Sequence, residues 1–301
     1  MVEPWGPVEA EAYARRQEAT LGEVVLSAIR TVLDEIRTAI MSNPGIPDIG
    51  AWSGQSASWI AFIDDQLAAA VERIIGHVLS LGDYRSSTLD YAQTHMQTVR
   101  DRLVDWPQAA FDEVREELTL GIAAGDDSRA LRERVGDALD ITALTRATET
   151  EMEILYDRIA EGVTPQREAE LRERIRELAE TSDVSRRRWE WRADRIARTE
   201  VAGAVNAGVE AYAAESTQAT GRQWWRRWWS SLDTRVRPSH RAAHGQVVAP
   251  GERFLVGGDM LRYPGDPTGS AGEVINCRCS VLLITADEAA DSGRTTESEP
   301  S

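Results

Sequence analysis

The chain has 301 residues, of which 42% are hydrophobic and 28% are charged, so it is long enough to bury one or two ordinary globular cores. It carries a net charge of −16 and only two cysteines, too few for a disulfide framework, so a reducing compartment is expected. No basic stretch followed by an apolar run opens the sequence, and no long uncharged apolar stretch occurs; neither a signal peptide nor a membrane span is expected.

Residues 8 to about 215 carry the pattern of helices. Apolar side chains recur every three or four positions from 8 to 40, and Asn43-Pro44-Gly45 then breaks the pattern. Thr164 and Pro165 are typical of the start of a further helix, which is dense in Arg and Glu. The remaining predicted helices of this region cover residues 56–81, 85–104, 108–123 and 128–160.

A long helix is predicted from Val184, and it lies in a segment whose charge is opposite to that of the whole chain. Between Val184 and Arg262 there are 14 Arg and 8 acidic residues. Such a basic segment in an acidic protein indicates contact with an anionic partner, or else a solvated face with internal ion pairs. The interface candidates on this helix are Arg187, Arg188, Arg192 and Arg195.

The same helix becomes rich in Ala and Gly between Ala197 and Gly208. Because small side chains let another backbone approach closely, this part is expected to pack against the domain that follows. After Gly221, short apolar pieces alternate with Gly and Pro turns, as in an α+β domain. The strands are expected within residues 223–230, 246–248, 253–256 and 274–285.

The predicted fold class is therefore α+β. A helical region, residues 1–183, precedes a small α+β domain with short strands, residues 184–285. Residues 286–301 are rich in Asp, Ser, Glu and Pro and are expected to form a disordered acidic tail.

Four tryptophans stand together in the first predicted strand. Each burial of a Trp side chain removes about 150–250 Å² from water, so about half of the cluster is expected in the core. Any exposed remainder would anchor a protein interface or stack on single-stranded nucleic acid. These interface candidates are Trp224, Trp225, Trp228 and Trp229.

The side chains most able to bind a transition metal gather in the C-terminal part. If Ser239 caps a helix, His240 and His244 lie on one face of it, and Cys277 and Cys279 would complete a tetrahedral structural zinc site. A strand over residues 275–283 argues against this, because it would place both cysteines on its apolar face and hold their sulfurs too far apart for one metal ion. In that case the cysteines are small buried core residues.

Asp233, Arg235, Arg237 and His240 form a second cluster, at nearly alternate positions. These residue types would bind phosphate or perform acid–base chemistry, or they would lock loops of a small domain. The sequence contains no recognisable nucleophile or second carboxylate beside them, which favours the structural role. Glu200 is the expected buried acidic partner of these arginines.

The order of several motifs resembles that of the phage Mu F-like head-morphogenesis family of minor capsid proteins. The resemblance covers about residues 190–285 and rests on Ile196-Ala-Arg198-Thr-Glu200, Ala204-Val-Asn206-Ala-Gly208, the Trp strand, Asp233-x-Arg235-x-Arg237-Pro-Ser-His240, the Phe254 segment, Pro264-Gly265-Asp266-Pro267 and Asn276-Cys277-Arg-Cys279. The residues that it carries over are Arg198, Glu200, Asp233, Arg235, Arg237, His240, Asn276, Cys277 and Cys279. The pattern does not require a histidine at His244, which weakens the four-ligand zinc hypothesis.

The resemblance implies a minor head protein of a tailed double-stranded DNA phage, present in few copies in the head interior or at the portal vertex and made in the host cytoplasm. It would act in procapsid assembly near the portal and in DNA packaging or ejection. Its implied partners are portal, major capsid or scaffold protein and packaged DNA, and it implies neither enzymatic activity nor a required cofactor. Two other hypotheses stay open. One is a nuclease or toxin-like effector that uses His240 with Asp233 or Glu200, with or without zinc. The other is a DNA-binding protein without catalysis, acting through the arginine-rich helix.

Overall fold

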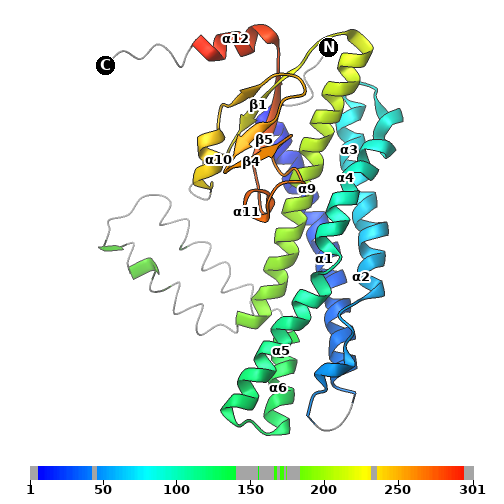
Figure 1. Ribbon diagram of the computed structural model, residues 1–301, viewed down its shortest axis with the longest axis vertical. Helices are drawn as coiled ribbons and strands as arrows, with labels where there is room; N and C mark the ends of the chain where they lie inside the picture. The colour runs from blue at the N-terminus through cyan, green and yellow to red at the C-terminus, as the bar shows by residue number, and fades with distance from the viewer. Residues whose placement is uncertain are drawn as a thin grey trace. The chain divides into compact units, whose positions relative to one another are not determined.

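The computed structural model describes residues 6–42, 46–139, 184–231 and 236–294, together with a few single positions between 155 and 174. These residues, drawn as ribbons in Figure 1, form two compact units. The first comprises residues of Met1–Val25, Ala61–Val104 and Asp194–Ser301, and the second comprises residues of Leu26–Ile60 and Asp105–Ala193. The units therefore interleave along the sequence, while the predicted boundary between 183 and 184 stays a prediction.

The predicted helices are present wherever the structure describes them. The periodic segment 8–40 forms α1 (Pro7–Ile40), and the segment 56–81 forms α2 (Ala57–Ala61), a π-helical turn (Phe62–Leu67) and α3 (Ala68–Ser80). They are followed by α4 (Thr88–Leu103), α5 (Trp106–Ala124), α6 (Ser128–Leu139) and α9 (Val184–Thr220), with short 3-10 turns at Ile49–Ala51 and Arg85–Ser87. The helix predicted to open at Thr164 falls largely outside the described residues.

The second unit is held together by aromatic packing around Trp59. This fully buried side chain stacks on Trp106 at a centroid distance of 4.6 Å, and Trp106 meets the edge of Trp189 at 5.9 Å. Trp189 is also buried, and its indole N–H donates to the carbonyl of Ala138 at 2.8 Å. Because a buried indole needs an acceptor, this bond fixes the start of α9 against the end of α6 within the unit.

In the first unit, the Ala- and Gly-rich part of α9 packs closely on two neighbours. A Cβ on Gly208 would lie 2.9 Å from the Cβ of Val78 in α3, and a Cβ on Gly203 would lie 2.9 Å from the carbonyl oxygen of Gly265. Neither contact leaves room for a larger side chain. The expected packing of this helix against the following domain is confirmed.

The C-terminal part contains two small antiparallel sheets (Figure 1). One has the order β2-β1-β5, formed by Val247–Val248, Trp225–Trp229 and Ser280–Ile284, with Trp228 opposite Val281. The other is the pair β3 (Phe254–Val256) and β4 (Asp259–Leu261). Short helices α10 (Pro238–Ala243) and α11 (Ala271–Val274) complete this α+β region, as the sequence predicts.

The tryptophan cluster divides as expected. Trp224 and Trp228 are buried, whereas Trp225 and Trp229 on the opposite face of β1 are half-exposed. Trp228 meets the edge of Phe254 at 5.3 Å and lies in the core beneath the sheet. Trp225 and Trp229, which are only partly exposed, stay predicted protein contacts.

Two expectations differ from the structure. The strand predicted over 274–285 begins only at Ser280, because the chain before it forms α11 and a turn. The first part of the expected disordered tail forms helix α12 (Ala286–Arg294), in which the Thr285 backbone N–H and hydroxyl both donate to Glu288. Residues 295–301 lie outside the described residues, and no described helix is long and apolar enough to span a bilayer.

Candidate metal centre

A tight turn brings the two cysteines together in front of β5. Asn276 has a left-handed backbone with φ of 61°, and the Cys277 N–H donates to the Val274 carbonyl at 3.2 Å. Asn adopts this conformation more readily than most residues because its short polar side chain can hydrogen-bond locally. The prediction of an extended strand here is therefore wrong, and so is the argument that strand geometry separates the two sulfurs.

His240 lies between these sulfurs and a carboxylate. Its Nδ1 is 3.4 Å from Cys279 Sγ and 3.7 Å from Cys277 Sγ, and its Nε2 is 3.0 Å from Glu273 Oε2. The Nε2–Glu273 contact has ion-pair distance but not hydrogen-bond geometry. His240 and both cysteines are buried, and the ring packs edge-on against Trp228.

Helix α10 positions His240, although not in the way that the sequence predicts. The cap position is occupied by Arg237, with Pro238 in the first turn, rather than by Ser239. Ser239 instead donates from its hydroxyl to Glu273 Oε2 at 2.8 Å. Glu273 in α11 therefore contacts two successive residues of α10 and fixes the two short helices to each other.

His244 is not part of this cluster. Helix α10 ends at Ala243, so His240 and His244 do not share a helical face as predicted. The Nδ1 of His244 accepts from the backbone N–H of Ser230 at 3.1 Å, and its ring lies 4.8 Å from that of Trp229. The four-ligand site predicted with His244 is therefore wrong.

The side chains that do converge are His240, Cys277 and Cys279, with one donor atom from each within 4.8 Å of the others. The hydrogen bond from Cys279 and the proximity of His240 hold the pKa of Cys277 well below its usual range, against the effect of burial. The same bond to Cys277, together with burial, raises the pKa of Cys279. Burial lowers the pKa of His240, but the interaction with Cys277 outweighs it and leaves a raised pKa.

The three side chains line a cavity of about 250 Å³ that is rich in arginine. Arg198, Arg237 and Arg278 contribute to its wall, and none of its described lining residues is Asp or Glu. Arg198 donates to Asn276 Oδ1 at 2.8 Å, and Arg237 donates to the Ile275 carbonyl. The cavity wall is therefore positively charged and is tied to the turn that carries the cysteines.

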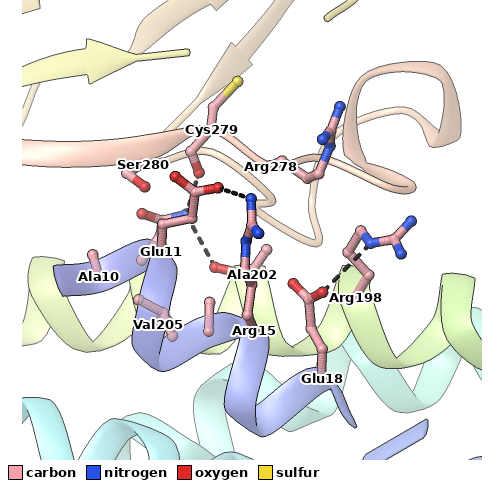
Figure 2. A pocket seen from close by; sticks show the side chains of 12 residues that line it. Ala10, Glu11, Arg15, Glu18, Arg198, Ala202, Val205, Arg278, Cys279 and Ser280 are labelled. Atoms are coloured by element: carbon pink, nitrogen blue, oxygen red, sulfur yellow. Dashed lines mark hydrogen bonds and ion pairs between the residues drawn. The ribbon is translucent and has the colours of Figure 1, made fainter. Parts of the chain in front are cut away.

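A second cavity of about 270 Å³ adjoins this one and shares Arg198, Arg278 and Cys279 with it (Figure 2). Its other wall is the N-terminal part of α1, from which Glu18 approaches Arg198 at 3.5 Å. Arg15 on the same helix pairs with Glu11 at 2.6 Å. Glu18 thus also offsets the charge of Arg198, which lines both cavities, whereas the Arg15–Glu11 pair lines the second cavity alone.

The rest of the predicted constellation is only partly brought together. Asp233 and Arg235 lie outside the described residues. Glu200 is buried as expected, but it accepts from Arg102 of α4 at 2.5 Å and lines neither cavity, so its predicted role as partner of Arg237 is wrong. Burial raises the pKa of Glu200, and Arg102 opposes this rise.

The arginine-rich start of α9 is less open than its sequence indicates. Arg192 stacks over Trp189 at 4.9 Å, and burial lowers the pKa of Arg195. Arg187 and Arg188 lie in the helix, but their side chains are outside the described part.

The sequence drew attention to Asn206 only as part of a motif. In the structure, the Asn206 side chain connects α9 to the backbone of Cys279, one of the two cysteines that face His240. Its amide donates to the carbonyls of Ala202, Pro264 and Cys279 at 2.9–3.0 Å, and its Oδ1 accepts from the N–H of Val281 at 2.9 Å. A polar residue within a run of Ala, Val and Gly was the signal for this role. Glu273 had no comparable signal, because its contact with His240 depends on the tertiary arrangement.

Asp266 plays a similar part in the loop after β4. It is fully buried and accepts from the backbone and guanidinium of Arg262 and from Thr268, at 2.9–3.1 Å. These bonds hold Gly265 against Gly203 of α9.

A comparison with models of known protein families matches residues 112–282 to "Phage Mu protein F like protein". The chain belongs to the phage Mu protein F-like family. The match covers more than half of the chain and begins well before residue 190, so it also includes most of α5 and all of α6. No curated protein and no solved structure matches the chain.

Family membership makes the chain a phage head-morphogenesis protein, with partners among head proteins and a place in the virion. Within the matched region lie His240, Cys277 and Cys279, together with Asn206 and Asp266. The cluster is thus part of the Mu F-like region itself.

Proposed function

We propose that this Mu F-like protein is a minor head protein that enters the procapsid in few copies near the portal and acts without catalysis. The observation that carries the proposal is the family match over residues 112–282. The partly exposed Trp225 and Trp229, on the outer face of the central strand β1, support a protein-binding role, because Trp side chains are typical interface anchors.

The contacts of the acidic residues also support a non-catalytic role. Glu200, one of the carboxylates expected to act with His240 in a nuclease, is occupied by Arg102. Among the residues that the structure describes, the carboxylate that reaches His240 is Glu273, and it also binds Ser239. This arrangement is typical of a structural lock between α10 and α11.

Co-expression tests the placement. The full chain is expressed with the portal, scaffold and major capsid proteins of the same phage, and particles are separated from free protein on a density gradient. We expect the chain in the particle fraction, with a marked loss when the portal gene is omitted. Recovery only as free protein contradicts a head role, and incorporation that is independent of portal contradicts the portal location.

Incubation with DNA and RNA tests the absence of catalysis. We expect the wild-type protein and the His240→Ala variant to leave both nucleic acids intact, with or without added divalent metal. Cleavage by the wild type that the variant lacks would establish the nuclease alternative. Binding of DNA that weakens steeply with salt would instead support contact with packaged DNA through the basic segment 184–262.

A further inference from the structure

The three converging side chains have the spacing of metal ligands. Zn²⁺ holds imidazole nitrogen at about 2.0–2.1 Å and thiolate sulfur at about 2.3 Å in tetrahedral geometry, so bound N and S atoms lie about 3.6 Å apart. The Nδ1 of His240 lies 3.4 Å from one sulfur and 3.7 Å from the other. The two nitrogen–sulfur distances are therefore those that a shared ion would impose, and all three donor atoms lie within 4.8 Å of one another.

The other side of the His240 ring supports the same assignment. Metal-bound histidines almost always donate their second N–H to a carboxylate, a backbone carbonyl or water, which fixes the ring and its tautomer. Here Nδ1 faces the sulfurs, while Nε2 lies 3.0 Å from Glu273, at ion-pair distance but without hydrogen-bond geometry. Ser239 donates to the same carboxylate oxygen and so holds it toward the ring.

The chemistry of the donors selects the type of metal. Two thiolates and an imidazole suit Zn²⁺ and other borderline or soft ions, whereas Mg²⁺ and Ca²⁺ prefer oxygen ligands. Among the described residues, no fourth His, Cys, Asp or Glu joins the group. The three ligand residues instead share a cavity with Arg198, Arg237 and Arg278.

We propose that His240 Nδ1, Cys277 Sγ and Cys279 Sγ bind one zinc ion, whose fourth position faces the arginine-lined cavity and takes water or a small anion. Glu273 is a positioning residue that acts through His240. A three-ligand ion with an exchangeable fourth ligand differs from the closed four-residue site that the sequence predicts. The proposal does not depend on the role in head assembly, since it rests on the cluster alone.

Metal analysis of the purified full chain tests the ligand set. After reconstitution with zinc and removal of the excess, we expect one zinc per chain in the wild type and at least a tenfold loss in Cys277→Ser, Cys279→Ser and His240→Ala. His244→Ala is the matched control, because His244 follows four residues after His240 but binds the backbone of Ser230. We expect this variant to keep its zinc. Less than a tenth of an equivalent in the wild type, or equal loss in His244→Ala, overturns the assignment.

Cobalt titration of the metal-free wild-type protein gives a readout that does not depend on the folding of variants. We expect one equivalent of Co²⁺ to produce thiolate-to-metal absorption and the visible bands of a four-coordinate ion. Added thiocyanate should shift these visible bands, since it replaces a water. The absence of thiolate absorption overturns the site, and bands that do not respond to the anion overturn the open position.

The Glu273→Gln variant tests the positioning role. We expect the same cobalt spectrum but an affinity about 10–100-fold lower, which is the usual effect of losing the carboxylate behind a metal-bound histidine. An unchanged affinity contradicts that role. Mass analysis of the untreated protein shows whether Cys277 and Cys279 form a disulfide instead of binding metal. A disulfide that persists in reducing buffer and excludes metal overturns the proposal.

Discussion

Asn206 is the clearest case of one side chain that fixes several elements. It is 2% exposed and satisfies four backbone groups, among them the Cys279 carbonyl and the Val281 N–H. Because each buried polar group left without a partner costs about 1–3 kcal/mol, we expect Asn206→Ala to lower the free energy of unfolding by roughly 3 kcal/mol or more. Denaturant titration followed by Trp fluorescence measures this; a change below about 1 kcal/mol would contradict it.

Asn276 offers a matched pair of substitutions at the turn before the cysteines. Asn276→Gly and Asn276→Ala both remove the contact with Arg198, but only glycine adopts the φ of 61° without cost. We expect the alanine variant to be about 1 kcal/mol less stable than the glycine variant in the same titration. Equal free energies of unfolding for the two variants would contradict this prediction and show that the backbone at position 276 can leave the left-handed conformation without cost.

His95 makes stability depend on pH. Burial, followed by the nearby Arg102 and Arg262, lowers its pKa from 6.5 to about 4. Between these values the unfolded chain binds a proton that the folded chain does not, so the free energy of unfolding falls as the pH falls from about 6.5 to about 4, by about 3 kcal/mol in total.

The variant His95→Gln should remove most of this pH dependence. The control His77→Gln should leave most of it, because His77 is exposed. The free energy of unfolding of the wild type and both variants, measured at several pH values between 4 and 7, tests this assignment. Identical slopes for the wild type and His95→Gln would contradict the assignment.

At the residue level, the types of side chain that form the site were easier to predict from the sequence than their positions in space. The grouping of His240 with Cys277 and Cys279 follows from their residue types, and the structure brings them together. The inclusion of His244 was wrong because α10 stops at Ala243, and Glu273 was missed because only the packing of α11 on α10 reveals it.

At the scale of elements, the close packing of α9 gives a direct test. Gly203→Ala would place a Cβ 2.9 Å from the carbonyl oxygen of Gly265, and backbone cannot move aside as easily as a side chain. We expect a loss of about 1–3 kcal/mol in the free energy of unfolding. Gly136→Ala in α6 is the control, since its Cβ meets nothing within 4 Å and alanine favours helix; similar losses in both variants would contradict the packing argument.

Periodicity predicted helices such as α1 and α3 well because each has one apolar face, which leaves a regular trace in the sequence. It failed for β5, where an alternating pattern continues from Ile275 although the strand begins at Ser280. The turn at Asn276 and the bonds of Asn206 to Cys279 and Val281 compete with the extended conformation there, and neither is visible in an alternation of apolar residues.

At the scale of the whole molecule, motif order identified the family, but the division into units was not predictable. The start of α1 and the α3–α4 pair belong to the same compact unit as the C-terminal sheets. Such packing depends on contacts between residues far apart in sequence, for example Glu18 with Arg198. The family match from residue 112 likewise reaches beyond the part that the motifs cover.

If this Mu F-like protein is a fixed component of the phage head, purified procapsids contain a defined number of its copies. Quantitative mass spectrometry of gradient-purified procapsids, assembled from the proteins of the same phage at several expression levels of this chain, measures that number. We expect a small number of copies per particle that reaches a plateau as expression rises. Absence from purified particles, or a copy number that rises in proportion to expression, would contradict it.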